Sequence, residues 1–156
     1  MSRQNRIALA LAALVAACGP SMSTGGPTPA PITASRASAH WMATLTPVGA
    51  STVRGTAMVH SMNNRQTVEI QIAGGNASAV YPWHLHTGRC ADGMGSIVGS
   101  AQAYTALGAG SDGSAALTTD IPVALDASQH YHVNVHASPS DMGTIVSCGD
   151  LSAHDM

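Results

Sequence analysis

Alternating apolar and polar residues are the feature of this chain that most restricts its fold. Val68, Ile70 and Ile72 alternate with polar residues, and the segment 41–46 repeats the pattern. A period of two is that of a β-strand with one buried face. Five further segments fit strands, at residues 52–60, 80–86, 115–121, 131–137 and 144–151. No segment combines a 3.6-residue apolar period with helix-capping residues, so the sequence predicts strands nearly throughout.

Short runs of turn-forming residues separate the predicted strands. These runs are Asn63-Asn64, Gly74-Gly75-Asn76, Ser111-Asp112-Gly113 and Pro139-Ser140-Asp141. Glycine, asparagine and aspartate tolerate the backbone conformations of tight turns, and proline fixes one of them. Seven or eight short strands separated in this way predict an all-β domain, an antiparallel sandwich or barrel.

The N-terminus predicts export. Two arginines within the first six residues precede eleven consecutive apolar residues, 7–17, and Cys18 follows. This is the layout of a secretory signal peptide, and the apolar run is shorter than the roughly 20 residues that span a bilayer. Val15-Ala16-Ala17-Cys18 also resembles the bacterial lipobox, which implies a signal peptide at 1–17 and a lipid-modified Cys18. The lipid would anchor the protein to a membrane of the cell envelope, with its domain in the periplasm or outside the cell. An ordinary cleaved signal with an incidental cysteine is the alternative.

The rest of the chain divides into a tether and a domain. Residues 18–38 are rich in glycine, serine, threonine and proline, and their low apolar content predicts a flexible linker. Residues 39–152 are expected to form one domain with a single core. Without the signal peptide, four arginines against eight acidic residues leave a net charge of −4, and the chain has no lysine. Binding to nucleic acid, which needs a basic surface, is therefore not expected.

Cysteine usage favours a disulfide. The chain has three cysteines, and lipidation of Cys18 would leave Cys90 and Cys148. In an exported protein an even remainder favours a disulfide over two free buried thiols. A bond between Cys90 and Cys148 would close a long loop. By the loss of chain entropy in the unfolded state, it would add about 4 kcal/mol to the free energy of unfolding.

Two histidine clusters supply the candidate metal ligands. In Trp83-His84-Leu85-His86, strand alternation puts His84 and His86 on one face. In the segment 130–136 the residues that share a face are His130, His132, Asn134 and His136. Imidazole nitrogen is a common ligand of copper and zinc. A lone His-x-His on a strand is weak support by itself, because exposed histidines are common.

The order of these motifs resembles copper–zinc superoxide dismutase. The matching pieces are His84 and His86, Cys90 four residues further on, the valine-rich strand ending in His136, Ser147-Cys148-Gly149-Asp150, and an opening hairpin at 43–57. The resemblance covers residues 39–152. It implies a Greek-key β-sandwich or barrel and a disulfide between Cys90 and Cys148. It also implies copper ligands at His84, His86 and His136. His132, on the same predicted strand face as His136, is our candidate for a fourth ligand or a neighbour.

Two departures from the dismutase pattern argue against full catalytic speed. The interval between His86 and His130 contains no histidine, although the zinc ligands of that family lie there. Carboxylates alone make a poor zinc site, so zinc is not expected. The substrate-guiding arginine of the family falls at Ile145. Arg89 is the candidate catalytic residue that would replace it and supply positive potential for superoxide.

A second resemblance is to the CHRD (chordin-type) domain. Tyr131-His132-Val133-Asn134-Val135-His136 is close to the Y-V-N-V-H strand of that family, and Gly95-Ser96-Ile97-Val98 fits its glycine followed by a hydrophobic pair. This resemblance implies a related sandwich without assigned chemistry.

Methionine is unusually frequent for a chain without phenylalanine. Met58, His60 and Met62 alternate on one predicted strand, and His40 and Met42 do so on the strand before it. One interpretation is a surface of soft ligands suited to Cu(I). The other, which the sequence favours, is that methionines fill gaps in a core without phenylalanine while the histidines face solvent.

Three functions follow from these observations. The first is an exported, lipid-anchored, copper-binding protein that dismutates superoxide by Cu(II)/Cu(I) cycling with reduced efficiency. The second is a non-catalytic, CHRD-like envelope lipoprotein that binds or stores copper or contacts partners. The third is a purely structural sandwich. The sequence leaves open whether the protein is an enzyme.

Overall fold

The computed structural model describes residues 40–62 and 65–154. The predicted signal peptide, the lipidation site at Cys18, the tether and the turn at Asn63-Asn64 lie outside the described residues. More than half of the described residues are in strands and none is in an α-helix, so the prediction of an all-β domain is confirmed. Within the same residues, no helix is long and apolar enough to cross a membrane.

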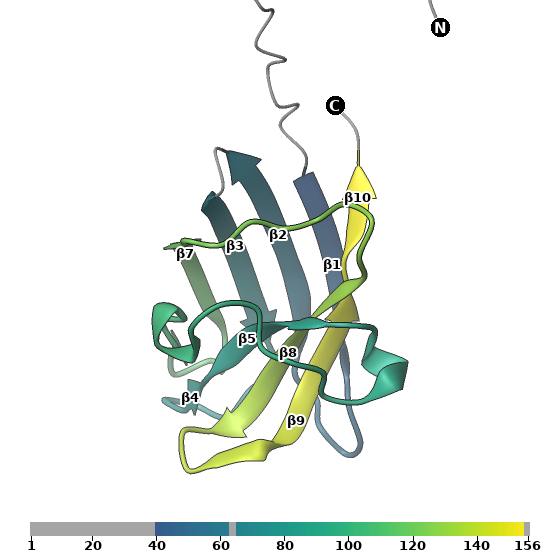
Figure 1. Ribbon diagram of the computed structural model, residues 1–156. Coiled ribbons are helices and arrows are strands. Elements are labelled where there is room, and N and C mark those ends of the chain that lie inside the picture. The colour runs from purple at the N-terminus through teal and green to yellow at the C-terminus, as the bar shows by residue number, and fades with distance from the viewer. Residues whose placement is uncertain (1–39, 63–64, 155–156) are drawn as a thin grey trace, which may run out of the picture. The chain divides into compact units, whose positions relative to one another are not determined.

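Ten strands make up the described domain (Figure 1). They are β1 (His40–Pro47), β2 (Arg54–Met62), β3 (Arg65–Ala73), β4 (Val80–Tyr81), β5 (Trp83–Thr87), β6 (Leu107–Gly108), β7 (Ala115–Ile121), β8 (Tyr131–Ser138), β9 (Asp141–Asp150) and β10 (Ser152–His154). Two 3-10 turns, η1 (Cys90–Asp92) and η2 (Ala101–Ala103), lie between β5 and β6. The main sheet is antiparallel and runs in the order β5-β8-β9-β1-β2-β3-β7, with β10 also paired to β1, while β4 and β6 form a separate pair.

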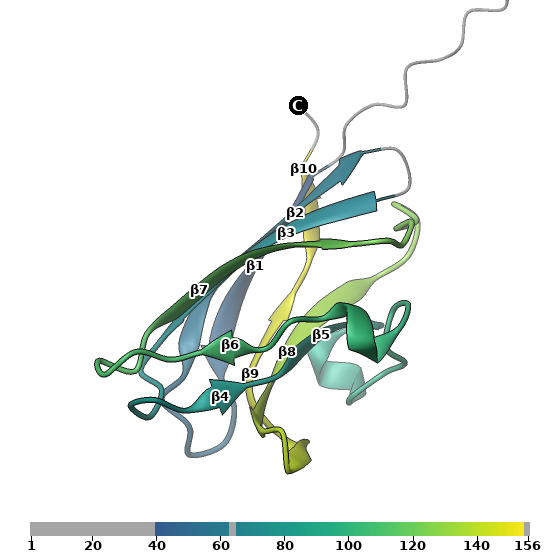
Figure 2. The ribbon, with the colours of Figure 1, turned by 90° about the vertical axis from the view of Figure 1, so that its left-hand side faces the viewer.

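The main sheet curls into a half-barrel because β1 takes part in both of its layers. Most of β1 pairs with β2, but its last residues, Thr46 and Pro47, pair with β9. One layer therefore contains β1, β2, β3 and β7, and the other contains β5, β8 and β9; the strands of the two layers cross obliquely (Figure 1). The connection 122–130 passes from β7 in the first layer to β8 in the second (Figure 2).

The core is formed by alternate residues of the paired strands. Its buried members include Trp41, Ala43, Leu45, Ala57, Val59, Val68, Ile70, Ile72, Trp83, Leu85, Val133 and Val135. Trp83 is the largest fully buried side chain, and its indole N–H donates to the carbonyl of Thr105 at 2.9 Å. Truncation of such an aromatic typically costs about 3–5 kcal/mol, so Trp83 is a principal source of stability.

Methionine does not contribute to this core. Among the described residues, none of the methionines belongs to the hydrophobic cluster. Met42 is 42% exposed and Met62 is 66% exposed. The interpretation that they fill gaps in the core is therefore wrong, and the physical reason is alternation: their strand neighbours occupy the inward positions.

The predicted strand at 80–86 is two strands, separated by Pro82. Val80 and Tyr81 pair with β6, whereas Trp83 onward pairs with β8. Proline has no N–H to donate to a neighbouring strand, and its carbonyl instead accepts from the N–H of His136 at 2.8 Å. The short strands β6 and β10 were not predicted, because two or three residues are too few to show a period.

The predicted disulfide between Cys90 and Cys148 is confirmed, with a Cα–Cα distance of 6.0 Å. It links η1 to β9, and the backbone N–H of Cys90 also donates to the carboxylate of Asp150 at 2.7 Å. The segment that follows β5 is therefore held onto the strand beside β8 by one covalent bond and one hydrogen bond to a charged acceptor.

Replacing Cys148 with alanine should lower the free energy of unfolding by about 2–5 kcal/mol, because the unfolded chain regains the entropy of an open loop. Urea unfolding measures the change. Reductant should lower the stability of the parent protein by a similar amount and leave that of Cys148→Ala unchanged. Equal stability of the parent and the variant would contradict the assigned contribution.

Candidate metal centre

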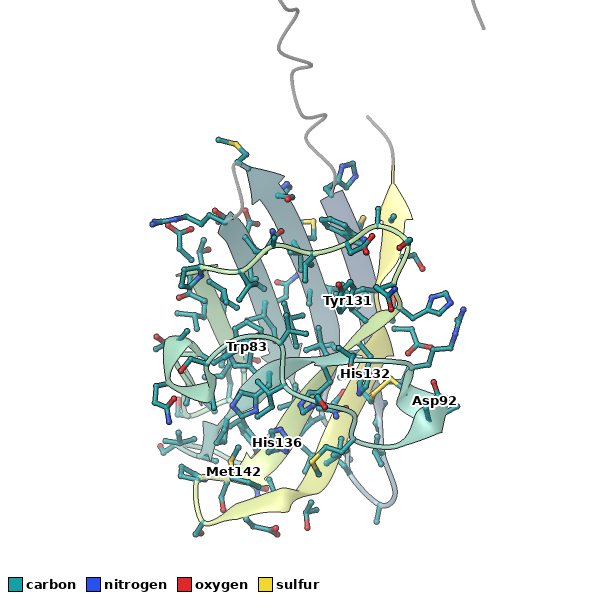
Figure 3. All side chains as sticks on the ribbon, in the orientation of Figure 1. Trp83, Asp92, Tyr131, His132, His136 and Met142 are labelled. Carbon is teal, nitrogen blue, oxygen red and sulfur yellow. A yellow bond between two sulfur atoms is a disulfide. The ribbon has the colours of Figure 1, made fainter. Side chains whose placement is uncertain are left out.

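Pairing of β5 with β8 assembles the candidate metal centre. The two strands are antiparallel, with His84 opposite Asn134 and His86 opposite His132. Trp83 and Leu85 point into the core, so strand alternation puts the histidines on the other face of this layer. Figure 3 shows Tyr131, His132 and His136 in succession along β8, with Met142 of β9 beyond His136.

Three of the four predicted ligands come together. His84, His86 and His136 each offer a ring nitrogen, and these three atoms lie within 4.8 Å of one another. Nδ1 of His84 is 3.2 Å from Nε2 of His136. Two nitrogens bound at about 2.0–2.1 Å to one metal ion would lie roughly 2.8–3.4 Å apart at ordinary coordination angles. The pair therefore already has the spacing of two ligands of one ion.

His86 is oriented by a carbonyl group. Its Nδ1 lies 3.3 Å from the carbonyl oxygen of Gly95, so the proton belongs on Nδ1. Nε2 then carries the lone pair, and it is buried with no hydrogen-bond partner. A backbone carbonyl on one ring nitrogen is the usual way in which a metal-binding histidine is fixed in orientation and tautomer. Gly95 has φ of 65°, and a Cβ there would collide with the carbonyl oxygen of Thr87, so only glycine fits.

Loop residues cover the histidine face. Ser96 and Val98 extend the sheet along the free edge of β5: the N–H of Thr87 donates to the carbonyl of Ser96, and that of Val98 to the carbonyl of Leu85, each at 2.9 Å. The Tyr104 ring packs against His84 at a centroid distance of 5.0 Å. As a result His84 is only 5% exposed, and His86 and His136 are each 1% exposed.

Burial keeps these imidazoles neutral. Burial, together with the charges that His136 and His86 would carry, lowers the pKa of His84 from 6.5 to about 4. Burial also lowers the pKa of His86 to about 4, against the opposing effect of the hydrogen bond that its ring donates to the Gly95 carbonyl. The pKa of His136 is lowered by burial too, and the backbone of Met142 and the charge of Asp141 oppose the shift. Neutral imidazole is the form that binds metal, so no proton has to be displaced at neutral pH.

His132, the proposed fourth ligand or neighbour, lies beside the three histidines. It is fully buried, and its ring stacks on that of His86 with centroids 5.4 Å apart and an interplanar angle of 18°. The amide of Asn134 donates to its Nε2 at 3.2 Å. This contact commits one nitrogen of His132 to a protein partner and leaves the ring as a support for His86. A role of His132 as a ligand stays a prediction.

Arg89 contacts a histidine outside the cluster. Its guanidinium donates to Nε2 of His130 at 3.0 Å, and both residues are exposed. His130 was expected on the same face as His132, but it precedes β8 and does not join the three buried histidines. Ile145, at the position of the guiding arginine in the dismutase resemblance, is the strand partner of His136. The guiding role of Arg89 remains a prediction.

Sequence reasoning missed two residues that shape the site. Gly95 was noted only as part of the CHRD-like segment, and nothing in the sequence showed that its carbonyl would meet His86. Tyr104 lies in a loop without periodicity, and no signal pointed to its contact with His84. Its buried hydroxyl donates to the carbonyl of Val98 at 2.6 Å, and burial raises its pKa to about 12.

The fold and the site together define an all-β domain with a buried three-histidine cluster able to hold a metal ion. Comparison with known proteins adds no family: no family model matches the chain, and no curated protein is significantly similar to it.

The metal-free protein should lose stability as the pH falls from about 6.5 towards about 4. The unfolded chain binds protons at His84 and His86 in this range and the folded chain does not, so acid favours unfolding. Urea unfolding at about pH 7 and about pH 5 measures the effect, and carboxyl groups contribute little between these values.

The double variant His84→Gln, His86→Gln is the control for this measurement. It should show a clearly smaller loss of stability between the same two pH values, because two of the groups that take up protons on unfolding are gone. The same loss in variant and parent would mean that these histidines are not the source of the pH dependence.

Proposed function

We propose that this protein is an exported, lipid-anchored domain that binds copper through His84, His86 and His136. The observation that carries the proposal is the convergence of three buried, neutral imidazoles whose nitrogens lie within 4.8 Å of one another. Nε2 of His86 is buried without a hydrogen-bond partner, which is costly, and a bound cation would satisfy it.

Copper is the metal favoured by the chemistry of the donors. The cluster contains imidazole nitrogens and no thiolate or carboxylate. Divalent copper binds nitrogen sites more tightly than the other first-row divalent ions do. The dismutase-like order of motifs supports the same choice, as does the Cys90–Cys148 disulfide, which is typical of a protein outside the cytosol. On this proposal the curled antiparallel sheet is a dismutase-like Greek-key sandwich or barrel.

Superoxide dismutation is the second candidate function. Three protein ligands leave a coordination position for another molecule, as catalytic metal sites require. Bound copper would supply one-electron cycling between Cu(II) and Cu(I). The contribution of the chain would be to hold the three imidazoles, exclude bulk water and present positive charge at Arg89. Near-complete burial of the ligands and Ile145 beside His136 favour slow turnover or none. If the protein does not turn over superoxide, the alternative applies: a non-catalytic, CHRD-like envelope lipoprotein that binds or stores copper or contacts partners.

Cu(II) should bind tightly to the purified protein, and His136→Gln should weaken the affinity by more than about tenfold. Loss of a residue that only hydrogen-bonds to a metal ligand typically lowers metal affinity roughly 10- to 100-fold, and loss of a ligand should cost at least as much. Competition with a chelator of known affinity measures binding, and the electron paramagnetic resonance spectrum reports nitrogen ligands. The matched control is His130→Gln, an exposed histidine of the same segment, which should bind copper as the parent does. Equal binding by all three proteins would refute the proposed site.

On the dismutase candidate, the copper-loaded protein should accelerate the decay of superoxide slowly, and Arg89→Ala should reduce that rate several-fold while leaving copper affinity unchanged. Removing an exposed cation lowers the surface potential that attracts an anion, so the rate should also become less sensitive to salt. Pulse-generated superoxide followed by its absorbance gives the rate. Undiminished activity in Arg89→Ala would remove that residue from the proposal. Bound copper without any acceleration would assign the protein to binding alone.

A further inference from the structure

A second group of candidate metal ligands lies on the other layer of the domain, on the outer face of β1 and β2. His40 is the strand partner of His60, and Met42 is the strand partner of Met58. The residues that alternate with them on the two strands are buried in the core, namely Trp41, Ala43, Ala57 and Val59. Strand alternation therefore turns both imidazoles and both thioethers outward, in a two-by-two array that we call the His/Met patch.

The dimensions of the His/Met patch suit a single ion. The rings of His40 and His60 have centroids 6.1 Å apart and are tilted by 31°. Side chains directly opposite each other on antiparallel strands start from Cβ atoms roughly 4.5–5.5 Å apart, and diagonal neighbours from roughly 7–8 Å. Methionine has three rotatable side-chain bonds, so its sulfur can move toward a point between the strands without any shift of the backbone.

Packing does not explain why methionines stand here. Met42 is 42% exposed, and Met58 is half-buried on the outer face. An exposed thioether adds nothing to the core, and threonine occupies the neighbouring outward positions at Thr44 and Thr56. The two methionines instead place soft sulfur atoms beside two imidazoles.

Charge next to the patch favours a cation. Glu69 on β3 is the strand partner of Met58, and its carboxylate lies 4.0 Å from Nε2 of His60. A carboxylate at this distance attracts a positive ion and, because it is half-exposed, does so without a large desolvation cost.

We propose that His40, Met42, Met58 and His60 form an exposed Cu(I)-binding site. Thioether and imidazole together select Cu(I) over the harder divalent ions, which prefer nitrogen and oxygen ligands. The site is separate from the buried cluster of His84, His86 and His136, which lies on the other layer. It stands independently of the copper function proposed for that cluster.

The test is a Cu(I) titration against a chromophoric Cu(I) chelator under reducing, oxygen-free conditions. The protein with the substitutions His84→Gln and His136→Gln, which disable the buried cluster, should retain Cu(I) binding. Adding Met42→Leu and Met58→Leu should lower the remaining Cu(I) affinity by more than about tenfold, because two ligands of the ion are lost. Methionine-to-leucine exchange nearly conserves volume, and thermal unfolding checks that the fold is intact.

Met62→Leu is the matched control, because Met62 shares the strand and the face but lies opposite Arg65 rather than a residue of β1. It should leave the Cu(I) affinity unchanged, and excess Zn(II) should not displace Cu(I) from the patch. Methyl resonances of Met42 and Met58 should shift on addition of Cu(I), and that of Met62 should not. Undiminished binding after the loss of Met42 and Met58, an equal effect of Met62→Leu, or displacement by Zn(II) would each overturn the proposal.

Discussion

The pairing of β5 with β8 in a single register is the constraint on which the site depends. Trp83 and Leu85 face the core from β5, and Val133 and Val135 do so from β8. A slip of one residue would turn these apolar side chains outward and drive the histidines into the core. The register is therefore fixed by apolar burial, and the positions of the ligand nitrogens follow from it.

Both faces of the β5–β8 pair are covered, which is unusual for an antiparallel layer. This burial costs folding free energy where it leaves polar atoms without partners. Nε2 of His86 and Nδ1 of His132 are buried without a hydrogen-bond partner. Each such group typically costs about 1–3 kcal/mol. Burial of the apolar core, the disulfide and the edge pairing at Ser96 and Val98 offset this cost. The fold thus retains a group of histidines that lowers its stability. Such a departure from optimal stability is expected at functional sites.

Much of the fold, and the heart of the site, could be predicted from the sequence. Alternation located seven strand segments, one of which is two strands, and the spacing His84-x-His86 identified two of the three clustered histidines, because a period of two is visible in short segments. The break at Pro82, the strands β6 and β10 and the contact of Tyr104 depend on partners distant in sequence, so no local pattern contained them. For the methionines, the local pattern was the better guide. Met42 is next to Trp41, which is buried, so alternation predicts that Met42 faces outward, whereas the absence of phenylalanine from the composition favoured methionines in the core.

The cysteine bridge has a consequence for the order in which the molecule is completed. Cys90 begins the segment that covers the histidines, and Cys148 lies on the strand next to β8. Such a bond forms only where thiols are oxidised, whereas synthesis takes place where they are kept reduced. The covering segment is therefore fixed to β9 only under oxidising conditions. On the proposed function, a metal ion would therefore be enclosed only when this bond forms, so the redox compartment as well as affinity would decide which ion is held.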